Sequence, residues 1–195
     1  MKKINWKLDP MHSEIQFKVK HLMLTTVTGH FRSFKAEAAT EEDGFNQATD
    51  ISFTADVNSL DTNNSQRDNH LKSPDFFNAA EFPELKFVAK TFSASGGQLK
   101  GELTMRGITK PVTFQVEFHG TTTDPIGQTK AGFSLNGKLS RKEFGLHWNA
   151  LTEARGVVVG DEVKIFAEIQ FTREAEKLQE KAGTGSKLVI EEKNG

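Results

Sequence analysis

Hydrophobic and polar residues alternate along several separate stretches of this chain. Between residues 14 and 21, Ile15, Phe17 and Val19 fall on one side of an extended backbone, and the residues between them, such as Lys18, are polar. Successive side chains of a strand point to opposite faces, so this alternation predicts a strand with one face buried and one face in water. The same pattern recurs at 51–57, 99–105, 112–118, 131–139 and 163–171, and more weakly at 29–38 and 85–92.

Eight antiparallel strands of this kind must hide the edges of their sheet. Closure into a barrel hides the edges most completely, whereas a sandwich of two sheets buries the same faces and leaves edges. We therefore expect an all-β fold, a single eight-stranded antiparallel barrel with short helical insertions, and keep the sandwich as the alternative. With 195 residues, 36% of them hydrophobic, the chain is long enough to bury one such core.

Two stretches interrupt the alternation. Residues 64–72 predict a short helix, which Ser73-Pro74 ends. Residues 141–149 predict a loop or a single helical turn. Neither interruption is large enough to form a domain, so both are expected as insertions in the barrel.

The composition of the chain changes after Arg173. Residues 174–181 predict a short helix in water, and the glycines that follow break it. We therefore expect one barrel domain over residues 1–173 and a C-terminal appendage over 174–195, made of a short helix and a frayed tail.

Composition and spacing exclude several classes of site. The chain has no cysteine, so disulfides, cysteine zinc sites and thiol nucleophiles are excluded. Its formal net charge is −1, whereas a nucleic-acid-binding protein needs a basic surface. No two histidines are four residues apart, the spacing of helical metal motifs. We expect no metal, no cofactor and no nucleic-acid partner.

The sequence also lacks the features of membrane insertion. No stretch approaches the roughly 18 apolar residues that a membrane-spanning helix requires. The first ten residues lack the apolar run of a signal peptide. We therefore expect a soluble protein without stable membrane insertion, cytoplasmic as the sequence is written and periplasmic if a signal has been removed from it.

Four predicted strands carry a small residue in the middle of a bulky face, namely Ala55, Gly101, Gly137 and Ala167. In an eight-stranded barrel such residues either widen the centre for one small ligand or fit the taper of a filled interior. The 16 phenylalanines and the absence of tyrosine suit a wall around an alkyl or isoprenoid chain. A buried tyrosine hydroxyl would need a partner there, and leaving it unpaired costs about 1–3 kcal/mol.

The densest polar cluster lies in the predicted helix. Arg67 and His70 are three residues apart and share one helix face, with Asp68 beside them. This cluster either binds a polar head group or a small anion, or its charges pair with other strands and hold the helix in place. Arg141, just after a predicted strand, has the same two interpretations.

The chain also carries a series of specific motifs in a fixed order. They are Trp6-x-Leu8-Asp9-Pro10-x-His12-Ser13-x-Ile15-x-Phe17-x-Val19-x-His21, Gly29-x-Phe31, Arg67-Asp68-x-His70-Leu71, Phe76-Phe77, Phe82-Pro83, Gly101-x-Leu103-Thr104-x-Arg106-Gly107-x-Thr109-Lys110-Pro111, Arg141-x-Glu143-Phe144-Gly145-Leu146 and Gly160-Asp161-x-Val163. Over about residues 4–173 this series resembles the YceI-like family. The chain departs from the family pattern at His30, where an arginine is common, and in the tail from residue 174.

The resemblance implies a lipocalin-like antiparallel barrel around an elongated apolar tunnel that binds polyisoprenoids, quinone-like isoprenoids or fatty amides. The expected function is non-catalytic binding, transport or storage of a long apolar lipid, such as a polyisoprenoid or an isoprenoid quinone. A long-chain lipid is then the expected partner, and a homodimer stays open. The alternatives are an enzyme that acts on a lipid head group at the barrel mouth and a stress-related interaction domain with a packed barrel.

Carried over by position, the expected tunnel wall consists of inward side chains of the alternating strands. They are Ile15, Phe17, Val19, Phe31, Phe53, Ala55, Val57, Leu99, Gly101, Leu103, Phe114, Val116, Phe133, Leu135, Ile165 and Ala167. The expected mouth, where a head group would lie, consists of Arg67, Asp68, His70, Phe76, Phe77 and Arg141.

Overall fold

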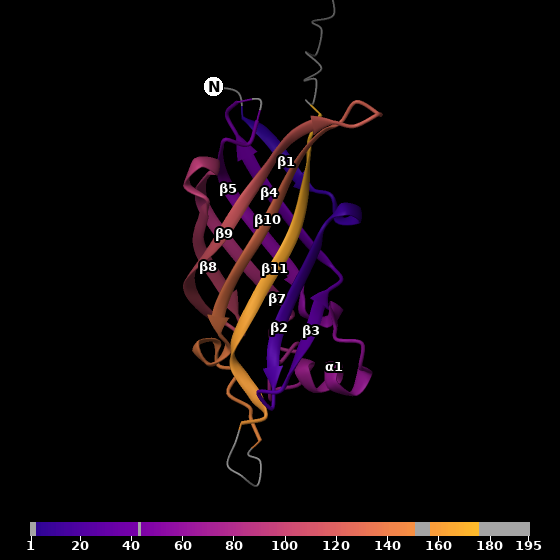
Figure 1. The fold of residues 1–195 in the computed structure, drawn as a ribbon, viewed down its shortest axis with the longest axis vertical. Coiled ribbons are helices and arrows are strands. Elements are labelled where there is room, and N and C mark those ends of the chain that lie inside the picture. The colour runs from indigo at the N-terminus through magenta and orange to yellow at the C-terminus, as the bar shows by residue number, and fades with distance from the viewer. Residues whose placement is uncertain (1–2, 43, 151–156, 176–195) are drawn as a thin grey trace, which may run out of the picture.

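The computed structural model describes residues 3–42, 44–150 and 157–175 (Figure 1). Within these residues there are eleven strands, one short α-helix, α1 (Ser65–Lys72), and four turns of 3₁₀-helix, η1 (Pro10–His12), η2 (Val57–Ser59), η3 (Ala94–Gly96) and η4 (Arg141–Phe144). The strands are β1 (Ile4–Leu8), β2 (Glu14–His21), β3 (Thr25–Phe31), β4 (Phe34–Thr40), β5 (Gln47–Asp56), β6 (Leu60–Asp61), β7 (Glu84–Ser93), β8 (Gln98–Met105), β9 (Ile108–Thr123), β10 (Thr129–Ser140) and β11 (Val159–Arg173).

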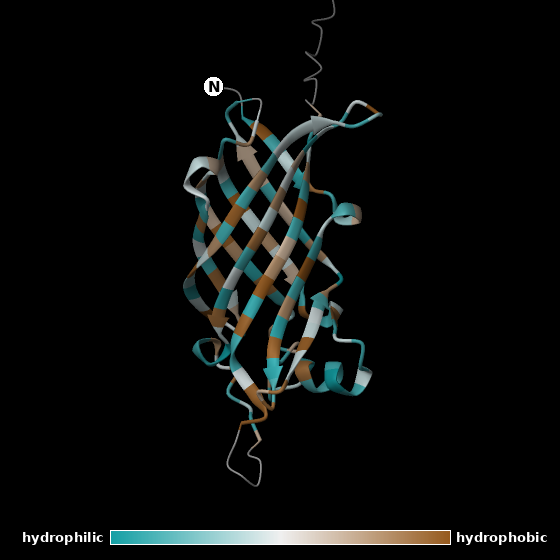
Figure 2. Cartoon of the chain, in the orientation of Figure 1, coloured by the Kyte–Doolittle hydropathy of each residue, from teal (hydrophilic) through white to brown (hydrophobic). Residues whose placement is uncertain are grey.

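The strands close into a barrel with eight positions. Around the barrel the order is β1, β4, β5, β7, β8, β9, β10 and β11, and β11 pairs back with β1. Strand β2 continues the position of β1 and pairs with another part of β11, while β3 pairs with β2 and leads into β4. All these pairs are antiparallel. Because the pairing of β11 with β1 closes the sheet on itself, the predicted eight-stranded barrel is confirmed and the sandwich is wrong. Figure 2 shows apolar and polar residues alternating along the strands.

The turn η1 divides the first barrel position into β1 and β2. Pro10 begins this turn and has no N–H to donate to a neighbouring strand. Asp9 caps the turn, because its carboxylate accepts a hydrogen bond of 3.1 Å from the backbone N–H of Met11. The same carboxylate accepts hydrogen bonds from Gln170 Nε2 at 3.1 Å and Lys130 Nζ at 3.3 Å, so the interruption is held to β10 and β11.

The structure differs from the sequence prediction at the short strands. Strands β1 and β6 are not predicted, because five and two residues are too few for a recognisable alternation. The predicted strand 29–38 is two strands, β3 and β4, since the chain bends between them. At this bend the backbone N–H groups of Arg32 and Ser33 leave the strand ladder and donate to the carbonyl and the hydroxyl of Ser59, at 3.1 and 3.0 Å.

Both predicted insertions lie at one end of the barrel. Helix α1 confirms the helix expected at 64–72, and it begins after Asn64, whose side chain accepts a hydrogen bond of 2.9 Å from the N–H of Arg67. The stretch 141–149 contains η4, the single helical turn expected there.

The expected C-terminal helix and tail lie outside the described residues from 176 onward. Up to that point the chain still runs along β1. The N–H of Glu174 donates to the carbonyl of Asn5 at 2.9 Å, and Glu174 Oε1 lies 2.6 Å from Lys7 Nζ.

Candidate functional site

The barrel encloses a cavity of about 430 Å³, which lies within the roughly 300–1,000 Å³ typical of ligand pockets. Most of the wall is formed by aliphatic and aromatic side chains that point inward from the strands. An interior with such a space is not a packed one, which counts against the alternative of a packed barrel. The interior therefore offers an apolar environment to a ligand.

The structure places most of the predicted wall residues on this cavity. They are Ile15, Phe17, Val19, Phe31, Phe53, Leu99, Leu103, Phe114, Val116, Phe133, Leu135, Ile165 and Ala167. Ala55, Val57 and Gly101 are not on the wall. Ala55 and Val57 are completely buried in the packing around the end of β5 and η2, with 0% and 1% of their surfaces exposed.

Gly101 is separated from the cavity by an aromatic ring. A Cβ atom at this position would lie 2.5 Å from Cζ of Phe87, a separation that real contacts do not show. Gly137 has the same relation to Phe114, because a Cβ atom added at Gly137 would lie 2.7 Å from Cδ1 of that ring. The idea that these glycines widen the centre is therefore wrong: each one lets a phenylalanine ring lie against the backbone of a neighbouring strand.

Sequence reasoning missed further wall residues for two reasons. Phe45 lies in the loop between β4 and β5, where no alternation points to it. Phe92 is out of phase with Leu85 and Phe87 on β7, because the register of β7 against β8 shifts between Val88 and Ser93. The alternation does mark some of the missed residues, such as Phe87, whereas Leu71 on α1 and Trp148 in the loop after η4 lie outside any strand.

Aromatic rings close one end of the cavity. Phe45, 3% exposed, packs with its ring centroid 5.0 Å from that of Trp6, 4.9 Å from Phe133 and 5.4 Å from Phe171. Trp6 is held in turn, because its Nε1–H donates to Thr40 Oγ1 at 3.0 Å. This is the end of the barrel that carries β1, at the top of Figure 1. A ligand chain would therefore end against the ring of Phe45.

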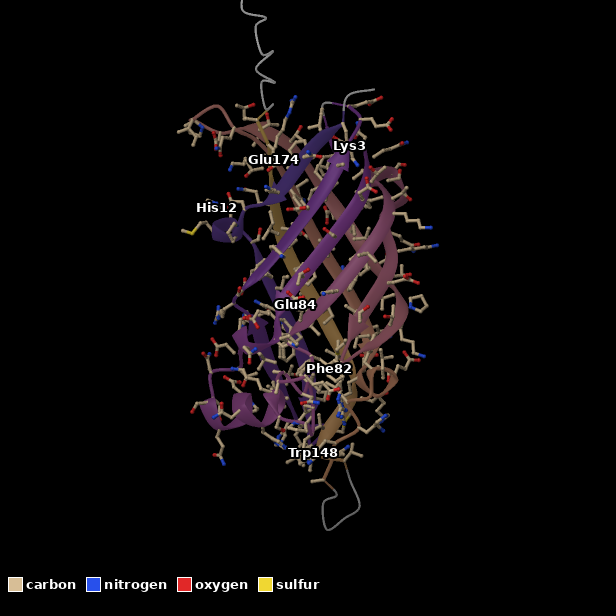
Figure 3. The ribbon with its side chains drawn as sticks, turned by 180° about the vertical axis from the view of Figure 1, so that it is seen from behind. Lys3, His12, Phe82, Glu84, Trp148 and Glu174 are labelled. Carbon is tan, nitrogen blue, oxygen red and sulfur yellow. The ribbon has the colours of Figure 1, made fainter. Side chains whose placement is uncertain are left out.

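The opposite end carries the polar residues of the wall. Lys20, His21 and Arg67 line the cavity there and are exposed to solvent, so the cavity opens at this end. In Figure 3 the side chains gather around Trp148 at this end of the barrel. We call the opening between α1, the β2–β3 turn and the loop after η4 the mouth. The arrangement places apolar groups along the depth of the cavity and charged groups at its entrance.

His70 forms part of an aromatic cluster at the mouth. Its ring lies edge-on to Phe76 and Trp148, with centroids 5.1 and 4.6 Å away. Its Nε2 is 2.8 Å from Oδ2 of Asp75. His70, Phe76 and the neighbouring Phe77 all line the cavity. The cluster forms one side of the entrance.

The other charged residues of α1 hold the helix to the chain before it. Arg67 donates from Nε to Thr62 Oγ1 at 2.8 Å and from Nη2 to the carbonyl of Thr62 at 2.7 Å. Asp68 is buried and accepts from the N–H of Thr62 at 2.9 Å. Asp68 does not line the cavity, so its placement at the mouth is wrong. Arg67 lines the cavity and keeps an exposed surface.

Arg141 is a buried cation, only 3% exposed, that lines the cavity. Its Nε donates to the carbonyl of Gly160 at 2.8 Å, Nη1 to those of Leu146 and Trp148, and Nη2 to that of Val159 at 3.1 Å. Burial lowers the pKa of Arg141 from its usual value, and the charge of Asp161 acts in the opposite direction. With these donors bonded to carbonyls, Arg141 joins η4, the following loop and β11, so the prediction that it meets a head group loses its support.

The described part of the chain contains no helix long and apolar enough to cross a membrane.

Comparison with known proteins agrees with this architecture. The model of the YceI-like domain matches residues 6–171. A UPF0312 protein of Staphylococcus epidermidis is 38% identical over 175 residues, which cover 88% of this chain and 98% of that protein.

Two solved structures have a similar fold. The YceI protein of Campylobacter jejuni is 27% identical, with a TM-score of 0.64 over 80% of this chain and 90% of that one. A polyisoprenoid-binding domain from Saccharophagus degradans is 13% identical, with a TM-score of 0.63 over 87% and 98%. The family model spans most of the described barrel, and the chain belongs to the YceI-like family.

Proposed function

We propose that this protein binds one long apolar lipid, of the isoprenoid class, inside the barrel and carries or stores it without catalysing a reaction. The observation that carries the proposal is the apolar cavity of about 430 Å³, closed by aromatic rings at one end and open at the other. The lipid chain extends toward Phe45, and its polar group stays at the mouth near Arg67 and His70. The domain from Saccharophagus degradans, described as polyisoprenoid-binding, supports the ligand class through its shared fold.

The energy of binding is sufficient for such a ligand. Burial of one methylene group contributes about 0.8 kcal/mol, so ten of them contribute about 8 kcal/mol. Association costs an estimated 4–15 kcal/mol in lost freedom, and a chain of many isoprene units exceeds the lower part of this range. Length and apolar character therefore decide affinity, and the charged mouth decides which end enters last.

The test has two parts: detection of a bound lipid, and a substitution that fills the cavity. Native mass spectrometry and solvent extraction of the purified protein should reveal a co-purified lipid, and the lipid-free protein should take up an isoprenoid quinone. Ala167→Phe adds a ring on the cavity wall and should lower uptake at least tenfold while the barrel stays folded. Glu102→Phe adds the same ring at an exposed position of β8 and should leave uptake unchanged. No co-purified lipid together with no uptake by the wild type would exclude the proposal.

Enzymatic action on a head group is the second candidate, favoured by the contact of His70 with Asp75 at the mouth. A histidine next to a carboxylate has the chemistry of a general base. This candidate requires turnover of a lipid ester or phosphate that disappears in His70→Ala and does not disappear in Lys142→Ala, an exposed charge change on η4. A screen in which the wild type turns over no such lipid removes the candidate.

A further inference from the structure

The turn between β2 and β3 exposes three consecutive apolar side chains. Leu22 is 38% exposed, Met23 62% and Leu24 79%. Val157 lies next to this turn along the chain that enters β11 and is 40% exposed. In Figure 2 the lower end of the barrel is brown where β2 turns into β3. This is a cluster of apolar surface, unlike the single exposed apolar residues that are common on soluble proteins.

The backbone of this turn disfavours the residues that it carries. The N–H of Leu24 donates to the carbonyl of His21 at 3.0 Å, and the two central residues, Leu22 and Met23, have φ angles of 52° and 57°. Such a turn favours Asn-Gly, because bulky residues are strained at positive φ. Met23 stays mostly exposed at this strained position, and Leu22 still exposes more than a third of its surface. Backbone strain at Leu22 and Met23 is therefore not fully offset by burial within the chain. We take it as a sign that these side chains contact something outside the chain.

The turn forms one rim of the mouth. His21 and Lys20, directly before it, line the cavity. The N–H of Leu22 donates to the carbonyl of Val158 at 2.8 Å, and Val158 also lines the cavity. Whatever the turn contacts therefore lies beside the entrance that a ligand must use.

The hairpin that carries the turn is basic. Residues 15–36 contain no aspartate or glutamate, and they contain Lys18, Lys20, Arg32 and Lys35. Arg32 is paired with Asp61, with Nη2 2.9 Å from Oδ2. Lys18 lies 4.8 Å above the ring of Phe166 on β11, and Lys20 is exposed close to the turn. A surface with anionic groups above an apolar layer is complementary to this combination.

We propose that the turn 22–24, with Lys18 and Lys20 behind it, docks on the surface of an anionic lipid bilayer. The side chains of Leu22, Met23 and Leu24 enter the interface, and the lysines meet the lipid phosphates. The mouth then faces the membrane, so an apolar chain passes between bilayer and cavity with little exposure to water. The role that we give to docking, transfer of a lipid, rests on the proposed function. The docking itself can be measured without any ligand in the cavity.

The test measures binding of lipid-free full-length protein to vesicles by co-sedimentation. Vesicles of phosphatidylcholine with added phosphatidylglycerol should bind the protein more tightly than phosphatidylcholine alone, and salt should weaken this binding. The double variant Leu22→Asn, Met23→Gly gives the turn its preferred residues and removes two apolar side chains, so the barrel should fold at least as well as the wild type. Its vesicle binding should fall at least tenfold.

The matched control is Ile126→Ser. Ile126 is 80% exposed in the turn between β9 and β10, at the other end of the barrel, so this variant should bind vesicles like the wild type. Equal binding by the wild type and the double variant, or no binding by the wild type, overturns the docking proposal. A dimer in sedimentation velocity that the double variant dissociates overturns it as well, because the turn then contacts a second copy of the chain. Uptake of an isoprenoid quinone from detergent is measured separately, and its failure with intact vesicle binding counts against the proposed function alone.

Discussion

Asp9 gives the most quantitative prediction, because its carboxylate holds the interruption between β1 and β2. Its side chain is 13% exposed, and burial alone would raise its pKa. Hydrogen bonds outweigh burial and lower the pKa of Asp9 from 3.8 to about 2. They come from His12, Lys130, Gln170 and the backbone N–H of Met11.

The pKa shift has a definite consequence for stability. A carboxyl group with a lower pKa in the folded state stabilises that state at pH values above its unfolded pKa, and the contribution is lost as the pH falls through the folded pKa. For Asp9 the contribution is about 2–3 kcal/mol at neutral pH, since one pKa unit corresponds to about 1.4 kcal/mol. It should decline between a pH of about 4 and a pH of about 2.

The assay is urea unfolding of the wild type and Asp9→Asn across this pH range. The variant should lose about 2–3 kcal/mol of unfolding free energy near pH 7, and the difference should shrink as the wild-type carboxyl is protonated. Asp50→Asn is the control, because Asp50 pairs with Lys3 between two exposed side chains and surface ion pairs contribute little. A difference that stays constant from neutral to acid pH would refute the reasoning, since the charge of Asp9 would then contribute nothing.

Two further predictions concern the packing behind the wall and the buried cation Arg141. Gly101→Ala should destabilise the barrel by about 1–3 kcal/mol in thermal unfolding, because the added Cβ meets Phe87 and the backbone of Val88. Gly132→Ala is the control and should be tolerated, because the nearest atom to its added Cβ would be 3.8 Å away. Equal unfolding midpoints for the two variants would contradict the packing argument. Arg141→Met should cost about 3 kcal/mol, because it leaves buried carbonyls without their donor, and it should increase hydrogen exchange in the loop before β11. Exchange rates unchanged in that loop would show that Arg141 does not hold it.

The sequence predicts the barrel because alternation is a local property of each strand. It predicts helix α1 for a similar reason, since Asn64 and Pro74 are local signals of where a helix begins and ends. The bend between β3 and β4 depends instead on Ser59, which is more than twenty residues away. Such a partner is invisible to a pattern that reads only neighbours.

The same limit explains the errors in the predicted site. Alternation shows that Gly101 faces inward but not that a ring from the neighbouring strand covers it. The type and spacing of residues place Arg67 and Asp68 in one cluster, yet only the fold shows that both bind Thr62 and that only Arg67 reaches the cavity. Phe45 carries no periodic signal at all, although it closes the end of the cavity. Contacts between distant segments decide these points.

The phenylalanine content is explained by this cavity. Eleven of the 16 phenylalanines line it, among them Phe17 under β3, Phe87 over Gly101 and Phe114 over Gly137. A tyrosine in the depth of this wall would bring a hydroxyl without a partner, whereas at the mouth polar groups find partners in backbone carbonyls and in Asp75. Apart from Ser52 and the polar residues at the mouth, the described wall therefore offers only apolar side chains to a ligand. For the lipid that we propose, selectivity along the chain then comes from length and shape, and selectivity for the polar end comes from the residues at the mouth.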